Sequence, residues 1–446
     1  MPNKIAFNED YPVITESEKL YERAQPIMTP VTQTLAKGPG QYINGVAPKY
    51  LRKGKGAHVW DVDGNEYLDY NMAIGPLSLG YAYPRVDEAI IEQLKDGITF
   101  SMMHELEVEL AELVHQVIPN AQAIRISKTG ADVTSAAVRV ARAYTGRSKV
   151  LCCGYHGWHD WYIAVTSRSA GIPTEIKDLS ATFEYNDIAS VKEALDDDVA
   201  AVILEPFVFE APKDNFLQEL KTLCEANGTL LIFDEMWTGF RIAVGGAQEY
   251  FGVVPDLACY SKAFANGMPI SLLTGRRDVM ELFEKEVFFF TTFGGEALSL
   301  AAAVATIREM IEKNVPAYLA EKGKKLKDGY NALAAELGIA GYTRCTGYDC
   351  RSLVVFDAAA GNPLEVKSYV QQELIKRGIL WSGFHNMSFS HTDADVEYTL
   401  KAYREVLGLL REAVTAGDVG ARLKGLPVEA VFRKVSHFNM KPVVKG

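Results

Sequence analysis

The chain has 446 residues, of which 48% are hydrophobic and 23% charged, a composition that is ordinary for a globular protein with a sizeable core. Its formal net charge is −11 and it has no long basic run, which argues against nucleic acid as a partner. No apolar run approaches the roughly 20 residues that span a bilayer, and the N-terminus lacks the pattern of a secretion signal. We therefore expect a cytoplasmic protein that binds neither nucleic acid nor membrane.

The six cysteines of the chain form no C-x-x-C pair, and most of them lie in apolar runs typical of strands. Cysteines in such runs are usually buried, reduced thiols of a cytosolic protein. We therefore expect neither a disulfide framework nor a metal site. The cysteines are Cys152, Cys153, Cys224, Cys259, Cys345 and Cys350.

Residues 1–84 contain one clear local signal, an alternating pattern on both sides of Asp63-Gly64. The stretch HVWDVDGNEYLDY predicts a β-hairpin with a two-residue turn at this dipeptide. Residues 37–50, which precede the hairpin, have the Gly, Pro and Asn content of a loop. We assign residues 1–84 to an N-terminal segment that forms part of a small domain.

Residues 85–325 alternate between helical patterns and short apolar runs. Buried strands joined by helices are typical of a mainly parallel sheet that is covered on both faces. We therefore predict a large α/β domain over this range. The predicted strands are residues 123–127, 149–153, 200–206, 229–235, 257–261 and 270–275, and the clearest helices are residues 86–94, 106–117 and 215–227.

Residues 326–446 mix strands and helices in a different order, which favours a smaller α+β domain. The last stretch, residues 426–446, has no periodic pattern and is expected to form an irregular tail. The predicted elements are a helix over residues 324–337, strands over residues 352–357 and 379–383, and helices over residues 364–378 and 392–414.

Two carboxylates, Asp234 and Glu235, directly follow the apolar run LLIF. An acid at the end of a buried strand suits either the magnesium site of an ATPase or a pyridoxal phosphate site, where the acid binds the ring nitrogen of the cofactor. An ATPase also needs the sequence G-x-x-x-x-G-K-[ST]. Neither Gly-Lys pair, at residues 54–55 and 323–324, lies in that frame or precedes Ser or Thr, so the ATPase interpretation fails.

Three further features follow other predicted strands, and each fits pyridoxal phosphate. The tripeptide Thr-Gly-Ala at residues 129–131 opens a helix, whose N-terminal amides can bind a phosphate. The loop GYHGWHDWY at residues 154–162 is rich in aromatic side chains that suit a flat ring. Lys262 lies 262 − 234 = 28 positions after Asp234 at the end of a strand, where burial makes an amine nucleophilic toward an aldehyde.

Taken singly, these features have structural alternatives: a capped helix, a packed aromatic cluster, and a lysine whose amine reaches solvent. Together they lie where ligands bind in open α/β sheets, beyond the carboxyl ends of strands. The same segments resemble the class III aminotransferases of fold type I, and most of all the glutamate-1-semialdehyde aminomutase-like branch. The matching segments are KTGADVTSAAVRVAR, YHGWHD, LEP, FDEMWTGFR, YSKAFANGMP and TTFGGEALSLAAA.

The resemblance covers almost the whole chain, from the hairpin to NMSFSHTDADVEYTL at residues 386–400. It implies the α/β fold of the fold type I pyridoxal phosphate-dependent transferases. That fold has a mainly parallel seven-stranded sheet in the large domain, and a smaller α+β domain formed by the N- and C-terminal parts of the chain. The resemblance also implies pyridoxal 5'-phosphate as the cofactor and a homodimer with shared active sites.

The resemblance further implies a role for each matching residue. Lys262 would form a Schiff base with the aldehyde of the cofactor, and Asp234 would bind its ring nitrogen. Tyr155 would stack on one face of the ring, Met236 would close the other face, and Glu205 would lie near the phenolic side. The residues that would contact the phosphate are Thr129, Gly130 and Ala131, together with Thr292 from the neighbouring subunit.

The chain departs from the usual pattern of this family at two places. The family reads Ser-Gly-Thr-Glu-Ala where this chain reads Thr-Gly-Ala-Asp-Val, so that Ala131 has no hydroxyl group for the phosphate and Asp132 is shorter than Glu. After LEP, the usual Gly-rich stretch is replaced by FVFEAPKDNF at residues 207–216, which adds Glu210 near the expected substrate.

The expected activity is a transaminase reaction, in which an amino group passes from a small-molecule donor to an aldehyde or ketone acceptor. A 2,1-aminomutase of the glutamate-1-semialdehyde type and a racemase or epimerase would use the same residues, and the sequence leaves these alternatives open. The carboxylate of Glu210 favours an amino or polyhydroxy substrate over a dicarboxylate. The candidate substrate contacts are Gln41, Tyr42, Trp158 and Glu210.

Overall fold

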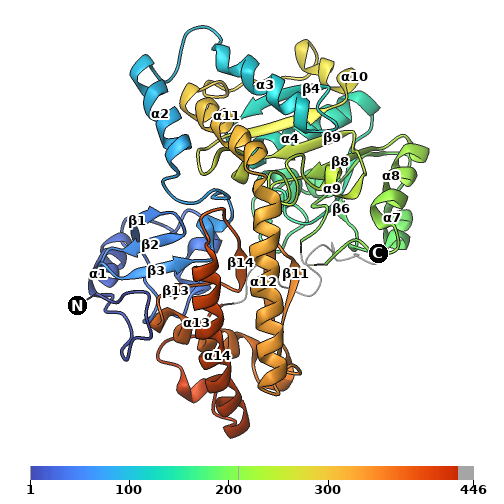
Figure 1. The fold of residues 1–446 in the computed structure, drawn as a ribbon. Helices are drawn as coiled ribbons and strands as arrows, with labels where there is room; N and C mark the ends of the chain where they lie inside the picture. Colours follow the sequence, from blue (N-terminus) through green and yellow to red (C-terminus); the bar gives the residue numbers. More distant parts are fainter. Residues whose placement is uncertain (1, 209, 430–446) are drawn as a thin grey trace. The chain divides into compact units, whose positions relative to one another are not determined.

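The computed structural model describes residues 2–208 and 210–429, and the chain divides into two compact units (Figure 1). The central unit comprises residues 84–316, and the terminal unit comprises residues 2–83 and 317–429. Each unit has its own β-sheet structure and its own hydrophobic core.

The central unit is built on one sheet with the strand order β4-β10-β9-β8-β7-β5-β6. β10 is antiparallel to both of its neighbours, and every other pair is parallel. All residues of β7 and β8 are buried, as expected for strands covered on both faces. The predicted mainly parallel seven-stranded sheet is therefore confirmed. Its strands are β4 (Ala123–Ser127), β5 (Lys149–Cys153), β6 (Ser180–Thr182), β7 (Val199–Leu204), β8 (Leu230–Asp234), β9 (Leu257–Tyr260) and β10 (Ser271–Gly275).

The helices of the central unit form because apolar residues recur at a spacing of three to four, and the longest of them carry an apolar stripe. α4 shows this most clearly, since Val133, Ala137 and Ala141 follow one another at intervals of four and are fully buried. The helices are α2 (Pro84–Asp96), α3 (Glu105–Val117), α4 (Gly130–Thr145), α5 (Asp160–Ile163), α6 (Thr174–Lys177), α7 (Ile188–Ala194), α8 (Phe216–Asn227), α9 (Ala247–Phe251), α10 (Arg277–Met280) and α11 (Ala297–Glu312).

The core of the central unit lies between α4 and the sheet. The buried stripe of α4 belongs to one cluster with Ile203 of β7, Ile232 of β8 and Leu273 of β10. Burying a side chain of this size contributes about 1.5–3 kcal/mol relative to leaving it exposed. This packing holds the first turn of α4 at the edge of the sheet where β7 and β8 end.

The terminal unit combines the two ends of the chain. β3 comes from the N-terminal part and pairs in parallel with β13 from the C-terminal part, with Leu68 opposite Ile379. This pairing confirms the prediction that the two ends form one smaller α+β domain. The four-stranded sheet has the order β1-β2-β3-β13 and the three-stranded sheet the order β11-β12-β14. The elements are α1 (Thr15–Ala24), β1 (Leu51–Lys55), β2 (His58–Asp61), β3 (Glu66–Asp69), α12 (Val315–Glu336), β11 (Thr343–Tyr348), β12 (Arg351–Phe356), α13 (Pro363–Lys376), β13 (Ile379–Leu380), β14 (Phe384–Asn386) and α14 (Asp393–Ala416).

The predicted boundary at residue 325 lies inside α12, and the units divide instead near the start of this helix. The apolar spacing recognised in the sequence covers only the C-terminal half of the helix. The first half begins with Val315-Pro316, where Pro is tolerated because its missing amide would have no partner in the first turn of a helix.

The predicted hairpin is present, but its two-residue turn is wrong. β2 and β3 are antiparallel, and the loop between Asp61 and Asn65 contains three residues. The amide of Asn65 donates to the Asp61 carboxylate at 2.8 Å, and its carbonyl accepts from the Asp61 amide at 3.0 Å. Gly64 supplies the left-handed conformation that such a loop needs, with a φ of 90°. The carboxylate of Asp61 therefore closes a longer loop than the Asp-Gly pair alone predicts.

All six cysteines are free and buried. Among the described residues, no helix combines the length and the apolar character that crossing a bilayer requires. Most of the predicted irregular tail, from residue 430 on, lies outside the described residues.

Candidate active site

The residues singled out in the central unit follow strands that end at one edge of its sheet. β5, β7, β8 and β9 are parallel neighbours; Asp234 is the last residue of β8, and β5, β7 and β9 are followed by Tyr155, Glu205 and Lys262. β4 runs in the same direction as these strands, because it is antiparallel to β10 and β10 is antiparallel to β9. The helix that opens at Gly130 therefore starts at the same edge. Ligands bind at this edge in open α/β sheets.

The first turn of α4 is a capped helix with two free amides. Thr129 is the N-cap, and its hydroxyl accepts from the amide of Asp132, while the Asp132 carboxylate accepts from the amide of Thr129 at 2.8 Å. Among the described residues, the amides of Gly130 and Ala131 have no acceptor. Two unpartnered amides at a helix N-terminus form a site for an anion. The shorter acid at position 132 thus completes the cap and leaves the anion site open.

The hydrogen bonds of this cap stabilise the charged form of Asp132. Burial opposes its charged form, but hydrogen bonds from Thr129, Ser127 and Lys128 outweigh that effect and lower the pKa of the carboxyl group. The carboxylate is directed at the amide of the N-cap residue. It therefore stabilises the start of the helix, and the remaining amides are available to a bound group.

Two glycines bring the neighbouring loops close to this turn. A Cβ atom at Gly130 would lie 2.9 Å from the Sδ atom of Met236, which follows β8. A Cβ atom at Gly157, in the loop after β5, would lie 2.7 Å from the Cβ atom of Ala131. Gly157 also has a φ of 105°, which an L-residue rarely adopts. The backbone of these loops can therefore approach a ligand on the first turn of α4.

Asp234 is the acid that faces this edge, and it has a buried partner that the sequence analysis did not assign. Its Oδ2 atom lies 2.7 Å from Nδ1 of His156, and both side chains are fully buried. Its Oδ1 atom accepts from the amide of Met236 at 3.1 Å. The other ring nitrogen of His156 has no partner among the described residues. The only signal for this pair in the sequence is that His156 follows a strand in the same sheet.

Two aromatic side chains pack on the ring of His156, and a hydrogen bond fixes its backbone. It is stacked on Trp161 with ring centroids 6.0 Å apart and an interplanar angle of 12°, and it meets Tyr162 edge to face. The carbonyl of His156 accepts from the Thr134 hydroxyl at 2.8 Å. This packing of the aromatic loop fixes the imidazole against the carboxylate of Asp234.

Glu235, the second acid after β8, has a structural role. Its carboxylate accepts from the amides of Ala247 at 2.8 Å and Gln248 at 3.0 Å, and also from the Thr238 hydroxyl. It therefore caps α9 from inside the core. Burial raises the pKa of Glu235 to about 7, and the hydrogen bonds only partly oppose this rise. The two adjacent acids thus point in different directions, since one faces the edge of the sheet and the other binds a helix.

Glu205 and Tyr155 are joined by a hydrogen bond between neighbouring loops. The amide of Tyr155 donates to Oε1 of Glu205 at 2.7 Å. The Oε2 atom of Glu205 is buried and has no partner among the described residues. The ring of Tyr155 is partly buried and packs edge to face on Tyr162 at 5.5 Å. The buried oxygen of Glu205 is placed to accept a hydrogen bond from a bound group.

Lys262 begins a short 3₁₀ turn directly after β9 and Ser261. Its φ is 50°, a left-handed conformation that is strained for a side chain of this size. Its Nζ atom lies 4.0 Å from the centroid of the Trp237 ring, which is buried after β8. The aromatic ring therefore holds the amine on the side of the sheet edge that also carries Asp234.

The remaining candidate residues are less buried or lie elsewhere. Thr292 and Trp158 are exposed in the central unit. Glu210 is also exposed and forms an ion pair with Lys213 at 2.9 Å, which the sequence did not indicate. Gln41 and Tyr42 belong to the terminal unit. In the part of the chain that is described, no group of three or more His, Cys, Asp and Glu residues is placed to hold a metal ion.

The central unit carries, at one edge of its sheet, groups of the kinds that suit a phosphorylated aromatic aldehyde. It combines an anion site at a helix start, a buried acid held by an imidazole, an orphaned buried carboxylate oxygen, and an amine at a strand end. The chain belongs to the class III aminotransferases, since the family model of that name matches residues 43–390. The expected family, enzyme class and fold are therefore confirmed.

The chain is similar to curated proteins along almost its whole length. It is 34% identical over 414 residues to the 3-aminobutyryl-CoA aminotransferase of Cloacimonas acidaminovorans, which covers 90% of this chain and 98% of that protein. It is also 34% identical over 429 residues to glutamate-1-semialdehyde 2,1-aminomutase 2 of Halalkalibacterium halodurans, which covers 89% of this chain and 99% of that protein.

The fold is similar to that of solved structures. The FumI protein of Sphingopyxis sp. MTA144, solved in its PLP internal aldimine form, superposes with a TM-score of 0.84 at 29% identity and covers 93% of this chain and 99% of that chain. An omega-transaminase from Sphaerobacter thermophilus superposes with a TM-score of 0.80 at 27% identity and covers 89% of this chain and 98% of that chain.

Proposed function

We propose that this protein is a pyridoxal phosphate-dependent aminotransferase in which Lys262 holds the cofactor covalently and Asp234 binds its ring nitrogen. The observation that carries the proposal is the buried pair of Asp234 and His156 at the end of β8, next to β9, the strand that Lys262 follows. A buried carboxylate is stabilised by a cationic partner in addition to its hydrogen bonds from His156 and Met236. A protonated ring nitrogen supplies that partner.

The other cofactor contacts follow from the unpartnered groups of the site. The amides of Gly130 and Ala131, beside Thr129, bind the phosphate, and the buried oxygen of Glu205 lies near the phenolic side of the ring. The ring of Tyr155 and the side chain of Met236 would cover its two faces. These roles remain proposals, and they are supported by the free amides and the orphaned carboxylate oxygen.

When bound, pyridoxal phosphate supplies an aldehyde that takes up the amino group and a ring that draws electrons from the neighbouring carbon. Asp234 keeps the ring nitrogen protonated. A charge pair at about 4 Å is worth about 4 kcal/mol at an effective dielectric constant of about 20, or roughly three pKa units. Once an amino donor has displaced it, the Nζ atom of Lys262 is free to take a proton from the donor carbon and to return it elsewhere.

The substrates in this proposal are a small-molecule amino donor and a carbonyl acceptor. Trp158 and Glu210 of the central unit, and Gln41 and Tyr42 of the terminal unit, are the proposed substrate contacts. The carboxylate of Glu210 would repel a second acid on the substrate and attract an ammonium or hydroxyl group. Its ion pair with Lys213 is exposed, so that a substrate can compete for either partner.

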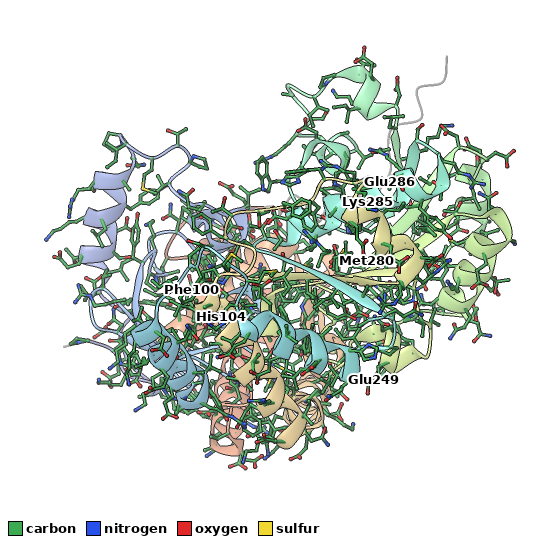
Figure 2. All side chains as sticks on the ribbon, turned by 90° about the horizontal axis from the view of Figure 1, so that it is seen from above. Phe100, His104, Glu249, Met280, Lys285 and Glu286 are labelled. Carbon is green, nitrogen blue, oxygen red and sulfur yellow. The ribbon has the colours of Figure 1, made fainter. Side chains whose placement is uncertain are left out.

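We also propose that the enzyme is a cytoplasmic homodimer with shared sites, in which Thr292 reaches the phosphate of the neighbouring subunit. The supporting observation is that two segments of the central unit, near residues 100–103 and 288–293, each expose large apolar side chains. Phe288 is 71% exposed and Met103 is 83% exposed. Phe100 stacks on His104 with ring centroids 5.1 Å apart beside Met103 in the sequence (Figure 2). Exposed apolar side chains that gather on one surface are typical of interaction surfaces, and a dimer would cover these.

A second candidate function is a 2,1-aminomutase, because relatives of that name are as similar to this chain as the aminotransferase is. The two reactions are separated by mixing the enzyme with an amino donor alone, in the absence of any acceptor. An aminotransferase releases one keto product per site and loses the absorbance band of its bound aldehyde. An aminomutase returns an isomer of the compound that was added, and a racemase returns only the mirror image.

A further inference from the structure

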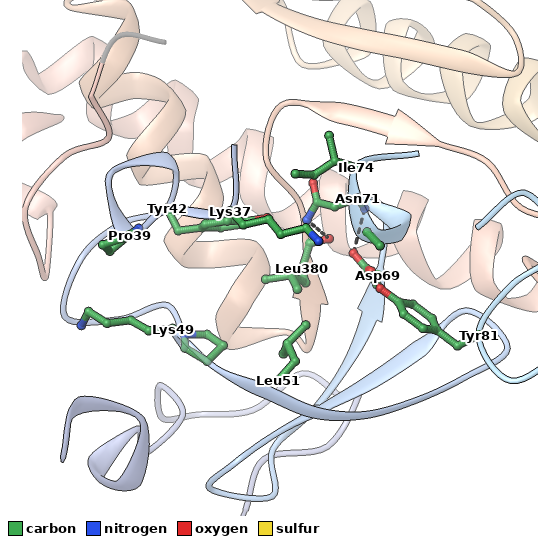
Figure 3. Close-up of a pocket in the computed structure, with 12 residues that line it drawn as sticks. Lys37, Pro39, Tyr42, Lys49, Leu51, Asp69, Asn71, Ile74, Tyr81 and Leu380 are labelled. Carbon is green, nitrogen blue, oxygen red and sulfur yellow. Dashed lines mark hydrogen bonds between the residues drawn. The ribbon is translucent and has the colours of Figure 1, made fainter. Parts of the chain in front are cut away.

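All residues that line a pocket of about 270 Å³ belong to the terminal unit (Figure 3). It lies between the loop that precedes β1, the residues that follow β3, and β13. A pocket slightly below 300 Å³ suits a small metabolite. The side chains that line it include Lys37, Tyr42, Asp69, Asn71, Ile74 and Leu380.

Asn71 presents an unsatisfied acceptor in this pocket. The residue is 5% exposed, and its Oδ1 atom is buried without a partner among the described residues. Its side-chain nitrogen already donates to the carbonyl of Leu380 at 3.5 Å, and its backbone amide donates to Asp69 at 2.7 Å (Figure 3). Buried acceptors in folded proteins are nearly always paired. The free oxygen is therefore placed to accept a hydrogen bond from a ligand.

Hydrogen bonds already fix the wall of the pocket that carries Asn71. The carboxylate of Asp69 accepts from the amide of Met72 at 3.1 Å and from the Tyr81 hydroxyl at 2.7 Å, in addition to the amide of Asn71. Residues 72–74 follow in left-handed conformations, with φ values of 45°, 53° and 70°. Three such residues in succession persist only where their surroundings fix them, and this kind of strain gathers at ligand sites.

The pocket also carries charges of opposite sign. Asp69 is 1% exposed, and burial raises its pKa to about 6, so that it is charged near neutral pH. Lys37 is exposed, and none of the described acids lies within ion-pair distance of its amine. The other lysine of the pocket, Lys49, is already paired with Glu18. Lys37 is thus the cation that a ligand can engage.

We propose that this pocket binds a small hydroxy- or amino-carboxylate, whose hydroxyl or ammonium group donates to Oδ1 of Asn71 and whose carboxylate pairs with Lys37. The aliphatic side chains of Ile74, Leu51 and Leu380 line the space between the polar ends. The inference does not depend on the chemistry of Lys262, because it concerns binding within the terminal unit alone.

Calorimetric titration of the holoenzyme with hydroxy acids tests the proposal. 3-Hydroxypropionate, 4-hydroxybutyrate and 5-hydroxypentanoate lack an amine and so do not react with the cofactor, and butanol and butyrate each carry only one of the two ends. We expect one hydroxy acid to bind at least tenfold more tightly than either one-ended compound. If no hydroxy acid binds better than butanol and butyrate, the proposal is wrong.

Two variants and one control locate the binding. Asn71→Leu removes the acceptor at similar volume, and Lys37→Gln removes the exposed cation without disturbing the core. Each should weaken binding at least tenfold, whereas Lys53→Gln should not, because Lys53 is exposed over the Trp60 ring and does not line the pocket. Affinity that is unchanged in Lys37→Gln would overturn the proposal even if Asn71→Leu fails to fold.

Inhibition kinetics distinguish the two sources of such a ligand. Competition between the hydroxy acid and the amino donor identifies the ligand as a part of the substrate, and inhibition without competition identifies it as a separate effector. In both cases the inhibition should weaken in Lys37→Gln. Inhibition that is equally strong in the parent and in both variants would place the hydroxy acid elsewhere and contradict the proposal.

Discussion

The Nδ1 atom of His156 lies 2.7 Å from the Oδ2 atom of Asp234, and both side chains are excluded from solvent. The imidazole comes from the loop after β5 and the carboxylate from the end of β8, two strands that are separated in the sheet by β7. The pair therefore links the aromatic loop to the acid that we expect to bind the cofactor.

Replacing Asp234 by Asn keeps the shape of the side chain and removes its charge. We expect the half-reaction with an amino donor to slow by at least two orders of magnitude, because the charge pair with the ring nitrogen is worth about 4 kcal/mol. Stopped-flow absorbance measures this rate. Asp256→Asn is the matched control, since Asp256 is also buried but pairs with Lys221 and Arg276. A rate for Asp234→Asn within threefold of the parent would show that the ring nitrogen is not held in this way.

His156 acts through Asp234 and is a positioning residue. In His156→Phe the carboxylate loses a hydrogen bond worth about 1.5–3 kcal/mol, so that the half-reaction should slow by roughly tenfold to a hundredfold. The absorbance spectrum and the pH profile of the bound cofactor should also shift, which a purely structural role would not cause. His115→Gln, at an exposed position, is the control. An unchanged spectrum together with an unchanged rate would separate His156 from the cofactor.

Two buried histidines of the terminal unit predict a pH-dependent stability. Burial lowers the pKa of His385 to about 3 and that of His391 to about 4, from an ordinary value of 6.5. Below pH 6.5 the unfolded chain binds protons at these sites and the folded chain does not. Stability is therefore fully present above pH 6.5 and falls as the pH decreases toward 3, by up to about 1.4 kcal/mol per histidine for each pH unit.

Denaturant unfolding between pH 7 and pH 4 measures this effect. His391→Gln should lower the stability at pH 7 and also flatten its decline with falling pH, whereas His115→Gln should leave the decline as in the parent. The same slope in all three proteins would mean that His391 does not remain neutral in the folded state.

The shared-site proposal is tested by mixing two inactive variants. Lys262→Ala lacks the reactive amine, and Thr292→Trp fills the space where a phosphate would lie. If Thr292 serves the site of the neighbouring subunit, a mixed dimer contains one site with both lesions and one with neither. Activity should then return on subunit exchange, to about a quarter of the parent level for random mixing. Proven exchange without recovery would place Thr292 and Lys262 in the same subunit's site.

The elements that the sequence predicted well are those with a strong local pattern. The six apolar runs of the central sheet became β4, β5, β7, β8, β9 and β10, because buried strands of a parallel sheet are apolar on both faces. β6 was missed because it has only three residues, Ser180–Thr182, two of which carry hydroxyl groups. The predicted length of the hairpin loop was wrong because the loop is closed by the side chain of Asp61, which the Asp-Gly pattern does not include.

In the candidate site, too, some residues have a local sequence pattern that predicts them, and others are recognised only from their contacts in the folded chain. Asp234 and Lys262 were recognisable because each lies at or just after the end of an apolar strand, and parallel strands end at one edge. His156, the partner of Asp234, could not be predicted. The chain has several histidines in loops, and no local pattern shows which of them contacts a carboxylate 78 residues later in the sequence. The sequence likewise predicts Trp237 only as a core residue. In the folded chain the centroid of its ring lies 4.0 Å from the amine of Lys262.

The most direct measurement is the identification of the lysine that carries the cofactor. Holoenzyme is reduced with borohydride, digested, and analysed by mass spectrometry, with Lys262→Arg treated in parallel as the matched control. We predict that the mass of the reduced cofactor is found on the peptide that contains Lys262 and is absent from the variant. Cofactor mass on another lysine of the parent enzyme would contradict the assignment of Lys262 and the site built around it.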